Sequence, residues 1–188
     1  MNTARPGVKL TYDYLLRLPE DRMRHELIDG VHYVTPPPNL NHQGISGNLY
    51  LLIASWLEVQ PTGRIYYAPV DVVFSVFDVV EPDLLYASNG RMAEIATTKH
   101  LRGAPNLVIE IGSPSTRKRD ETIKKGLYEQ RGVDEYWIVD PRVDVVRVLR
   151  REGREFGRVV ELSRGAGDVL TTPLLPGLDL PLSRVFRK

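Results

Sequence analysis

The 188-residue chain contains no cysteine. This absence excludes disulfide bonds, thiolate nucleophiles and cysteine-ligated zinc, and it favours a reducing compartment. Any bound metal therefore needs oxygen or imidazole ligands. The chain also lacks a net charge of one sign, because 25 basic side chains nearly balance 24 acidic ones. Composition alone therefore gives no indication of a polyanionic partner, as a strongly basic domain would.

Long hydrophobic runs are missing as well. The richest apolar stretch, residues 70–85, is too interrupted by carboxylates to span a bilayer. Residues 1–10 carry charges and a proline where a signal peptide needs a continuous apolar run. We therefore expect a cytoplasmic protein with no membrane partner.

Several enzyme signatures are absent too. There is no Walker-type glycine-rich loop, no serine in a nucleophile elbow, and no second histidine three residues after the pair His25-Glu26. A hydrophobic content of 42% over this length nevertheless suffices for one sizeable core. We expect a single domain over residues 1–188, with a core at about 10–150 and a C-terminal β-hairpin and irregular, proline-containing tail at 151–188.

Hydrophobic periodicity predicts an α/β protein with a mixed sheet. Three helices are expected. The first spans 12–18, the second follows the prolines 36–38 and has His42 in its first turn, and the third spans 118–131 and ends before Gly132. Strands are expected at 64–74, 79–87 with Asp83 inside, 106–111 with Glu110 near its carboxyl end, and 135–139. Hairpins are expected at the Asp29-Gly30 pair and between 143–149 and 156–162, and a loop or short helix at 88–104. Strand, helix and strand over 106–139 predict a parallel crossover.

Two carboxylates, Asp83 and Glu110, interrupt segments that are otherwise apolar. Burying an ionised carboxylate without a partner costs several kcal/mol or more. If the strands are neighbours, both side chains face one point, where Mg²⁺ or Mn²⁺ accepts oxygen ligands and activates water against a phosphodiester. The alternative is that each carboxylate pairs with an arginine or lysine, or lies on a solvated edge.

Asp120, Lys124 and Tyr128 recur every four residues, which places them on one face of the predicted helix after Glu110. Lys124 then reaches the carboxylates and orients water or stabilises developing negative charge. The alternative is a surface ion pair with Asp120. Lys125 competes for the role, because a one-residue shift turns a helical side chain by about 100°.

The motifs in order resemble a known superfamily. Val80-Glu81-Pro82-Asp83 and Asn106-Leu107-Val108-Ile109-Glu110 are similar to the proline-aspartate and glutamate elements of PD-(D/E)XK nucleases. The further motifs that carry the resemblance are His25-Glu26-Leu27-Ile28-Asp29-Gly30, His42, Ser113-Pro114-Ser115-Thr116, Lys124, Tyr128 and residues 132–141. Together they resemble the restriction endonuclease-like family abundant in cyanobacterial genomes, over about Leu10 to Leu149.

The resemblance implies a restriction-endonuclease-like core, a central mixed sheet flanked by helices, and a Mg²⁺- or Mn²⁺-dependent endonuclease acting on DNA. Asp83 and Glu110 would bind the metal, and Glu26 would complete or support the catalytic site. The usual lysine position, two residues after the glutamate, holds Gly112. The resemblance implies that Lys124 takes that role.

Two further side chains have open roles. In this family's pattern His42 hydrogen-bonds a phosphate or Glu26, and its alternative is to cap the helix start. Glu26 is alternatively a hairpin residue paired with Arg22 or Arg24. Tyr128 is expected next to the substrate or behind the ligands.

Two further segments, one aromatic and one basic, are expected to have structural rather than functional roles. The pair Tyr136-Trp137 is expected in the core rather than as a base-stacking platform. The basic run 117–119 is expected to be a solvated helix start, with phosphate contact as the alternative.

A rival function is a binding module that keeps the fold and an affinity for DNA or a protein but cleaves nothing. The joint presence of Asp83, Glu110 and Lys124 argues against it, since a binder gains little from acids facing phosphates. A homodimer is expected by analogy with nucleases that cut two strands.

Overall fold

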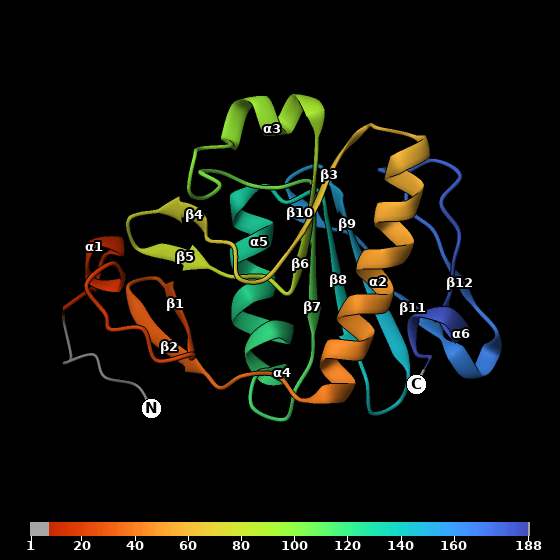
Figure 1. Ribbon diagram of the computed structural model, residues 1–188, viewed down its shortest axis with the longest axis horizontal. Helices are drawn as coiled ribbons and strands as arrows, with labels where there is room; N and C mark the ends of the chain where they lie inside the picture. Colours follow the sequence, from red (N-terminus) through yellow and green to blue (C-terminus); the bar gives the residue numbers. More distant parts are fainter. Residues whose placement is uncertain (1–7, 188) are drawn as a thin grey trace.

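A central mixed sheet flanked by helices forms the middle of the computed structural model, which describes residues 8–187 (Figure 1). In spatial order its strands are β10 (Glu155–Phe156), β9 (Val145–Glu152), β8 (Glu135–Asp140), β7 (Leu107–Ile111), β6 (Leu84–Ser88) and β3 (Gly63–Tyr67), and β11 (Val160–Ser163) also pairs with β9. Strands β7 and β8 are parallel and the other pairs are antiparallel. The predicted fold class and the parallel crossover are both confirmed.

A second, four-stranded sheet lies beside the first. Its order is β2 (Val31–Thr35), β1 (Arg24–Ile28), β5 (Asp78–Val80) and β4 (Val72–Ser75). The turn between β1 and β2 has positive φ at both Asp29 (51°) and Gly30 (71°), as a two-residue hairpin of this kind requires. The Asp-Gly hairpin predicted from the sequence is confirmed.

The two long strands predicted at 64–74 and 79–87 are each divided in the structure. One part of each belongs to the central sheet and the other to the second sheet, because the chain crosses between the sheets once within each predicted strand. Asp83 consequently lies immediately before β6. The prediction that it lies inside a strand is therefore wrong. Pro82 explains the break, since proline has no N–H to donate to a ladder.

The helices are α1 (Tyr12–Leu15), α2 (Leu40–Val59), α3 (Asn89–Ile95), α4 (Arg117–Arg119), α5 (Lys125–Arg131) and α6 (Leu182–Val185), with a π-helical turn η1 (Asp120–Lys124) and a 3₁₀ turn η2 (Arg164–Ala166). Helix α1 is shorter than the predicted 12–18. Helix α5 ends at Gly132 with φ of 87°, as predicted. In residues 8–187 no helix is long and apolar enough to cross a membrane. The expectation about a signal peptide concerns residues 1–10, most of which lie outside the described part.

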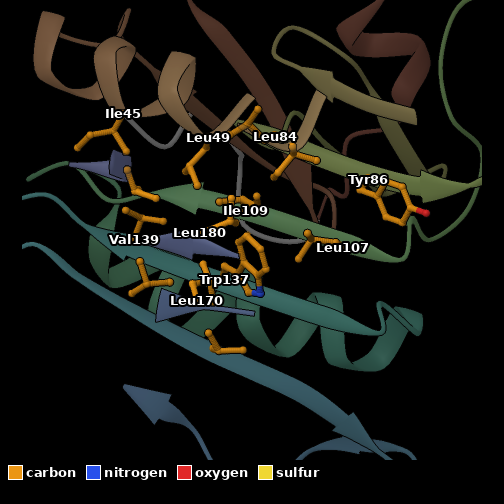
Figure 2. Close-up of a cluster of buried hydrophobic side chains, with 14 of the residues drawn as sticks. Ile45, Leu49, Leu84, Tyr86, Leu107, Ile109, Trp137, Val139, Leu170 and Leu180 are labelled. Carbon is orange, nitrogen blue, oxygen red and sulfur yellow. The ribbon is translucent and has the colours of Figure 1, made fainter. Parts of the chain in front are cut away.

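Helix α2 covers one face of the central sheet. Its buried residues Leu49 and Ile53 belong to one cluster with Ile109 and Trp137, and Figure 2 shows Leu49 close to the sheet residues of this cluster. Alternate strand residues, such as Tyr136, face the opposite side, where α5 packs. Tyr136 and Trp137 are thus core residues, as expected.

The C-terminal segment completes the core on the α2 side. Strand β12 (Val169–Leu170) pairs with β13 (Leu180–Pro181). The segment buries Leu170, Leu175, Leu178, Leu180, Leu182, Val185 and Phe186 in the same cluster as α2. The tail predicted as irregular therefore contributes directly to the packing, and the single domain over residues 1–188 stays a prediction.

Candidate functional site

The strand register brings Asp83 and Glu110 together. Strand β6 runs antiparallel to β7 with Leu84 opposite Ile109, so continuing the register by one residue places Asp83 opposite Glu110. Residues directly opposite each other share a face of the sheet. Both carboxylates are buried, at 3% and 2% exposed, and both line one cavity of about 450 Å³. The predicted convergence of the two acids is confirmed.

Asp83 is held by three donors. Arg24 Nη2 lies 2.8 Å from Oδ1, His42 Nε2 lies 3.1 Å from Oδ2, and the backbone N–H of Ile111 donates to Oδ2 at 2.7 Å. Burial by itself would raise the pKa of Asp83, but the hydrogen bond from His42 and the charge of Arg24 hold it well below its usual range. Asp83 is therefore ionised at neutral pH.

His42 does not contact Glu26, one of the two groups proposed for it from the sequence, and its contact with a phosphate stays a prediction. Its ring bonds Asp83 and not Glu26. The helix start is capped by Asn39, whose side chain accepts from the backbone N–H of His42 at 2.9 Å. Within the described residues, His42 Nδ1 is buried and has no hydrogen-bond partner.

Glu110 receives two donors from the helix that follows it. Lys124 Nζ lies 2.8 Å from Oε1 and the Tyr128 hydroxyl donates to the same oxygen at 2.6 Å. Lys124 is only 1% exposed, so the surface ion pair with Asp120 is wrong. Lys125 is only half-buried and does not line this cavity. Of the two lysines, it is therefore Lys124 that lies at the carboxylates.

Glu26 completes the buried charge network. Its Oε1 lies 2.7 Å from Lys124 Nζ and accepts the backbone N–H of Glu81 at 3.0 Å. Its Oε2 lies 3.3 Å from Arg119 Nη2. The predicted pairing of Glu26 with Arg22 or Arg24 is wrong, because Glu26 faces the helix instead. One ammonium group thus links Glu26 and Glu110.

Three arginines lie at the site, of which only Arg142 was not considered from the sequence; Arg24 was considered as a partner of Glu26, and Arg119 as part of the basic run 117–119. Arg24 and Arg119 lie in the charge network, and Arg142 lines the cavity with its side chain 59% exposed. Arg24 had a usable signal, since it stands two residues before Glu26 and therefore on the same face of β1. The expectation that the run 117–119 is solvated is wrong for Arg119, whose side chain is only 12% exposed.

The balance of charge around Glu110 is unfavourable to its ionised form. Burial raises the pKa of Glu110 to about 8. Lys124 acts in the opposite direction and lowers this pKa, but the neighbouring acids Asp120, Asp83 and Glu26 raise it further. Lys124 is shared with Glu26, whose pKa is lowered despite burial by Lys124 and Arg119. Glu110 therefore lacks a full counter-charge, which a bound cation would supply.

The donor set fits an oxygen-ligated cation. A carboxylate offers about four lone-pair positions, and among the described residues both donors to Glu110 reach Oε1, leaving Oε2 without a hydrogen bond. Residues 8–187 contain no cluster of three or more His, Asp or Glu side chains arranged for a metal. Two carboxylates with retained water are the kind of site that Mg²⁺ accepts.

Comparison with known proteins identifies the family. The model of the Uma2 family, described as "Putative restriction endonuclease", matches residues 12–183. The chain belongs to this family. The chain is 22% identical to a solved protein from Anabaena variabilis described as "a putative nuclease belonging to DUF820", with a TM-score of 0.78 over 94% of this chain and 97% of that one. At this identity the likeness shows the fold alone.

Two other comparisons add little to the Uma2 assignment. The type IIG restriction endonuclease BpuSI is 11% identical, with a TM-score of 0.41 over 66% of this chain and 13% of that one. This likeness carries no argument about function. No curated protein matches the chain.

The raised pKa of Glu110 predicts a pH dependence for the metal-free Uma2 protein. Folded Glu110 keeps its proton up to a pH of about 8, whereas its ordinary pKa is 4.5. Between these values the folded state binds the additional proton, so the free energy of unfolding falls as the pH rises. We expect the melting temperature in EDTA to fall less over this range in Glu110→Gln than in the wild type.

Calorimetry at about pH 5 and about pH 8.5 measures this difference. Burial also raises the pKa of Glu81, to about 7, and this effect remains in both proteins, so the variant should keep part of the slope. An identical slope in the two proteins would show that Glu110 ionises normally.

Proposed function

We propose that this protein is a metal-dependent endonuclease that hydrolyses phosphodiester bonds of DNA. The observation that carries the proposal is the meeting of Asp83 and Glu110 at one cavity, with the buried ammonium group of Lys124 bonded to Glu110. The family description and the description of the Anabaena protein as a nuclease support the same activity.

In this proposal Asp83 and Glu110 hold Mg²⁺ or Mn²⁺. The cation, when bound, lowers the pKa of a water ligand and neutralises charge on a phosphoryl oxygen. Arg24 and His42 keep Asp83 ionised and fix its direction. Because Tyr128 and Lys124 both donate to one oxygen of Glu110, they orient the other oxygen for the metal.

The cations around the cavity have separate tasks in the proposal. Lys124 carries a positive charge at the centre, since its pKa is raised by Glu110 and Glu26 in spite of burial. Its ammonium group stabilises negative charge that develops on the phosphate. Arg142 lies at the cavity with most of its side chain exposed, where it can bind a neighbouring phosphate of the DNA. Glu26 holds Lys124 in place from the opposite side.

Metal-dependent cleavage is the direct test. We expect the wild type to nick single-stranded, double-stranded or branched DNA in Mn²⁺ or Mg²⁺, to stop in EDTA, and to lose this activity in Asp83→Ala. Calorimetric titration with Mn²⁺ should give binding that Asp83→Ala weakens, because the carboxylate is an expected ligand.

The same experiment decides for or against the binding module. A protein that cleaves none of these substrates and releases no heat with Mn²⁺ would be a module that retains the nuclease fold without its chemistry. The homodimer expected for cutting two strands stays a prediction.

A further inference from the structure

A second cavity continues from the first along helix α2. Its volume is about 360 Å³, within the range of small-molecule sites. The two cavities share Arg24, Pro38, His42 and Asp83, so the second opens directly beside the carboxylate centre. The rest of its lining comes from α2 and from the end of β3, which Figure 1 shows next to each other.

The lining of the two cavities differs in charge. The first contains four cationic side chains, Arg24, Lys124, Arg119 and Arg142, together with three acidic ones, Asp83, Glu110 and Asp120. Beyond the shared residues the second has no charged group among the described residues, and is lined by Gln43, Ser46, Gly47, Tyr50, Tyr67 and Ala68. Phosphates are therefore favoured in the first cavity and an uncharged, flat group in the second.

Two tyrosines form the aromatic part of this second cavity. The rings of Tyr50 and Tyr67 are edge-to-face, with centroids 5.0 Å apart and an interplanar angle of 85°. Tyr67 pairs with Leu84 in the sheet and so shares its α2-facing side, but remains 59% exposed. The next residue, Ala68, donates its backbone N–H to the carbonyl oxygen of Asp83 at 3.1 Å. An accessible aromatic ring is thus tied by the backbone to the carboxylate centre.

Helix α2 leaves room at the same place. A Cβ built on Gly47 would meet no atom within 4 Å, and the same holds for Gly44 one turn earlier. A glycine in a helix costs about 1 kcal/mol relative to alanine. The helix bears this cost beside the tyrosine pair, where any larger side chain at position 47 would extend into the cavity.

We propose that the second cavity takes an unpaired nucleobase, stacked on Tyr67, while the adjoining phosphate lies at Asp83 and Glu110. The inference rests on the proposed function in taking DNA as the ligand. Every base has a flat aromatic face, so stacking on tyrosine is tolerant of sequence. A base inside a duplex is not available for this contact. The substrate class is therefore single-stranded DNA, or DNA with an unpaired or flipped nucleotide at the cut.

Equilibrium binding tests the inference without turnover. The probes are a fluorescein-labelled oligothymidylate of about twelve nucleotides and an abasic oligonucleotide of the same length, with Ca²⁺ as the metal and anisotropy as the readout. We expect the wild type to bind the base-bearing probe at least about fivefold more tightly than the abasic one. Tyr67→Ala should lose this preference, and Tyr67→Phe should keep it.

A second pair of variants tests the cavity floor. Gly47→Leu should bind the two probes equally because its side chain fills the cavity, whereas the matched Gly47→Ala should keep the preference and melt at the wild-type temperature or above. Equal affinity of the wild type for both probes, no binding of either, or an unchanged preference in Tyr67→Ala would overturn the inference. A base preference in a protein that cleaves nothing would instead overturn the nuclease proposal alone.

Discussion

Glu110→Gln is expected to abolish metal-dependent DNA cleavage and leave the protein folded. Glutamine keeps an oxygen that accepts from Lys124 and Tyr128, which both bond Oε1 at present. It replaces the second carboxylate oxygen by an amide nitrogen, which cannot bind a cation. Metal assistance is worth several kcal/mol, so the cleavage rate should fall at least about 10³-fold. Mn²⁺ affinity by calorimetry should fall with it.

A second buried glutamate provides the control. Glu135 is 1% exposed and, like Glu110, lies on a strand of the central sheet. Its carboxylate bonds Trp137, Thr172 and Arg150, and it does not line the first cavity. Glu135→Gln should keep the Mn²⁺ affinity and the cleavage rate of the wild type. A folded Glu110→Gln protein that cleaves at the wild-type rate would remove Glu110 from the reaction.

Lys124→Met should lower the stability of the protein more than any other single change at the site. The ammonium group of Lys124 bonds Glu26 at 2.7 Å and Glu110 at 2.8 Å, and all three side chains are buried. Removing one member of a buried ion pair leaves an uncompensated charge and costs about 3–5 kcal/mol. For a chain of this size that corresponds to a fall of roughly 6–20 °C in melting temperature.

The neighbouring lysine is the matched control for this change. Lys125 is only half-buried and lies outside the network, so Lys125→Met should change the stability by less than about 0.5 kcal/mol. Adding Glu26→Gln to Lys124→Met should recover part of the loss, since the carboxylate of Glu26, whose pKa is lowered by Lys124 and Arg119 in the wild type, is then neutral. If Lys124→Met has the melting temperature of the wild type, the buried ammonium group is not a structural counter-charge.

Spacing alone placed several side chains of the site, whereas the resemblance to PD-(D/E)XK nucleases gave Lys124 its expected role. Asp83 and Glu110 stood out because carboxylates in apolar segments need compensation, and the four-residue repeat of Asp120, Lys124 and Tyr128 fixed one helix face. That face survives in the structure even though η1 inserts a π-helical turn, with Lys124 and Tyr128 both bonded to Glu110. Local periodicity determines which side of an element a residue occupies, so these assignments did not need the fold.

The partners of those residues depended on contacts between distant segments. Arg24 reaches Asp83 across 59 positions, and Arg119 reaches Glu26 and Thr35 in the second sheet. No periodicity within one element encodes such pairings. For the same reason the two long predicted strands did not reveal that the chain crosses between two sheets.

The resemblance to PD-(D/E)XK nucleases pointed to Asp83, Glu110 and Lys124. The sequence by itself determined the mixed α/β class, the hairpin at Asp29 and the parallel crossover. These follow from backbone restrictions of glycine and proline and from the burial of apolar faces, which act within short segments. Only the tertiary structure decided that Asp83 precedes its strand, that His42 bonds it, and that the C-terminal leucines complete the core. Those outcomes are set by which surfaces exclude water together, and that depends on the whole packed chain.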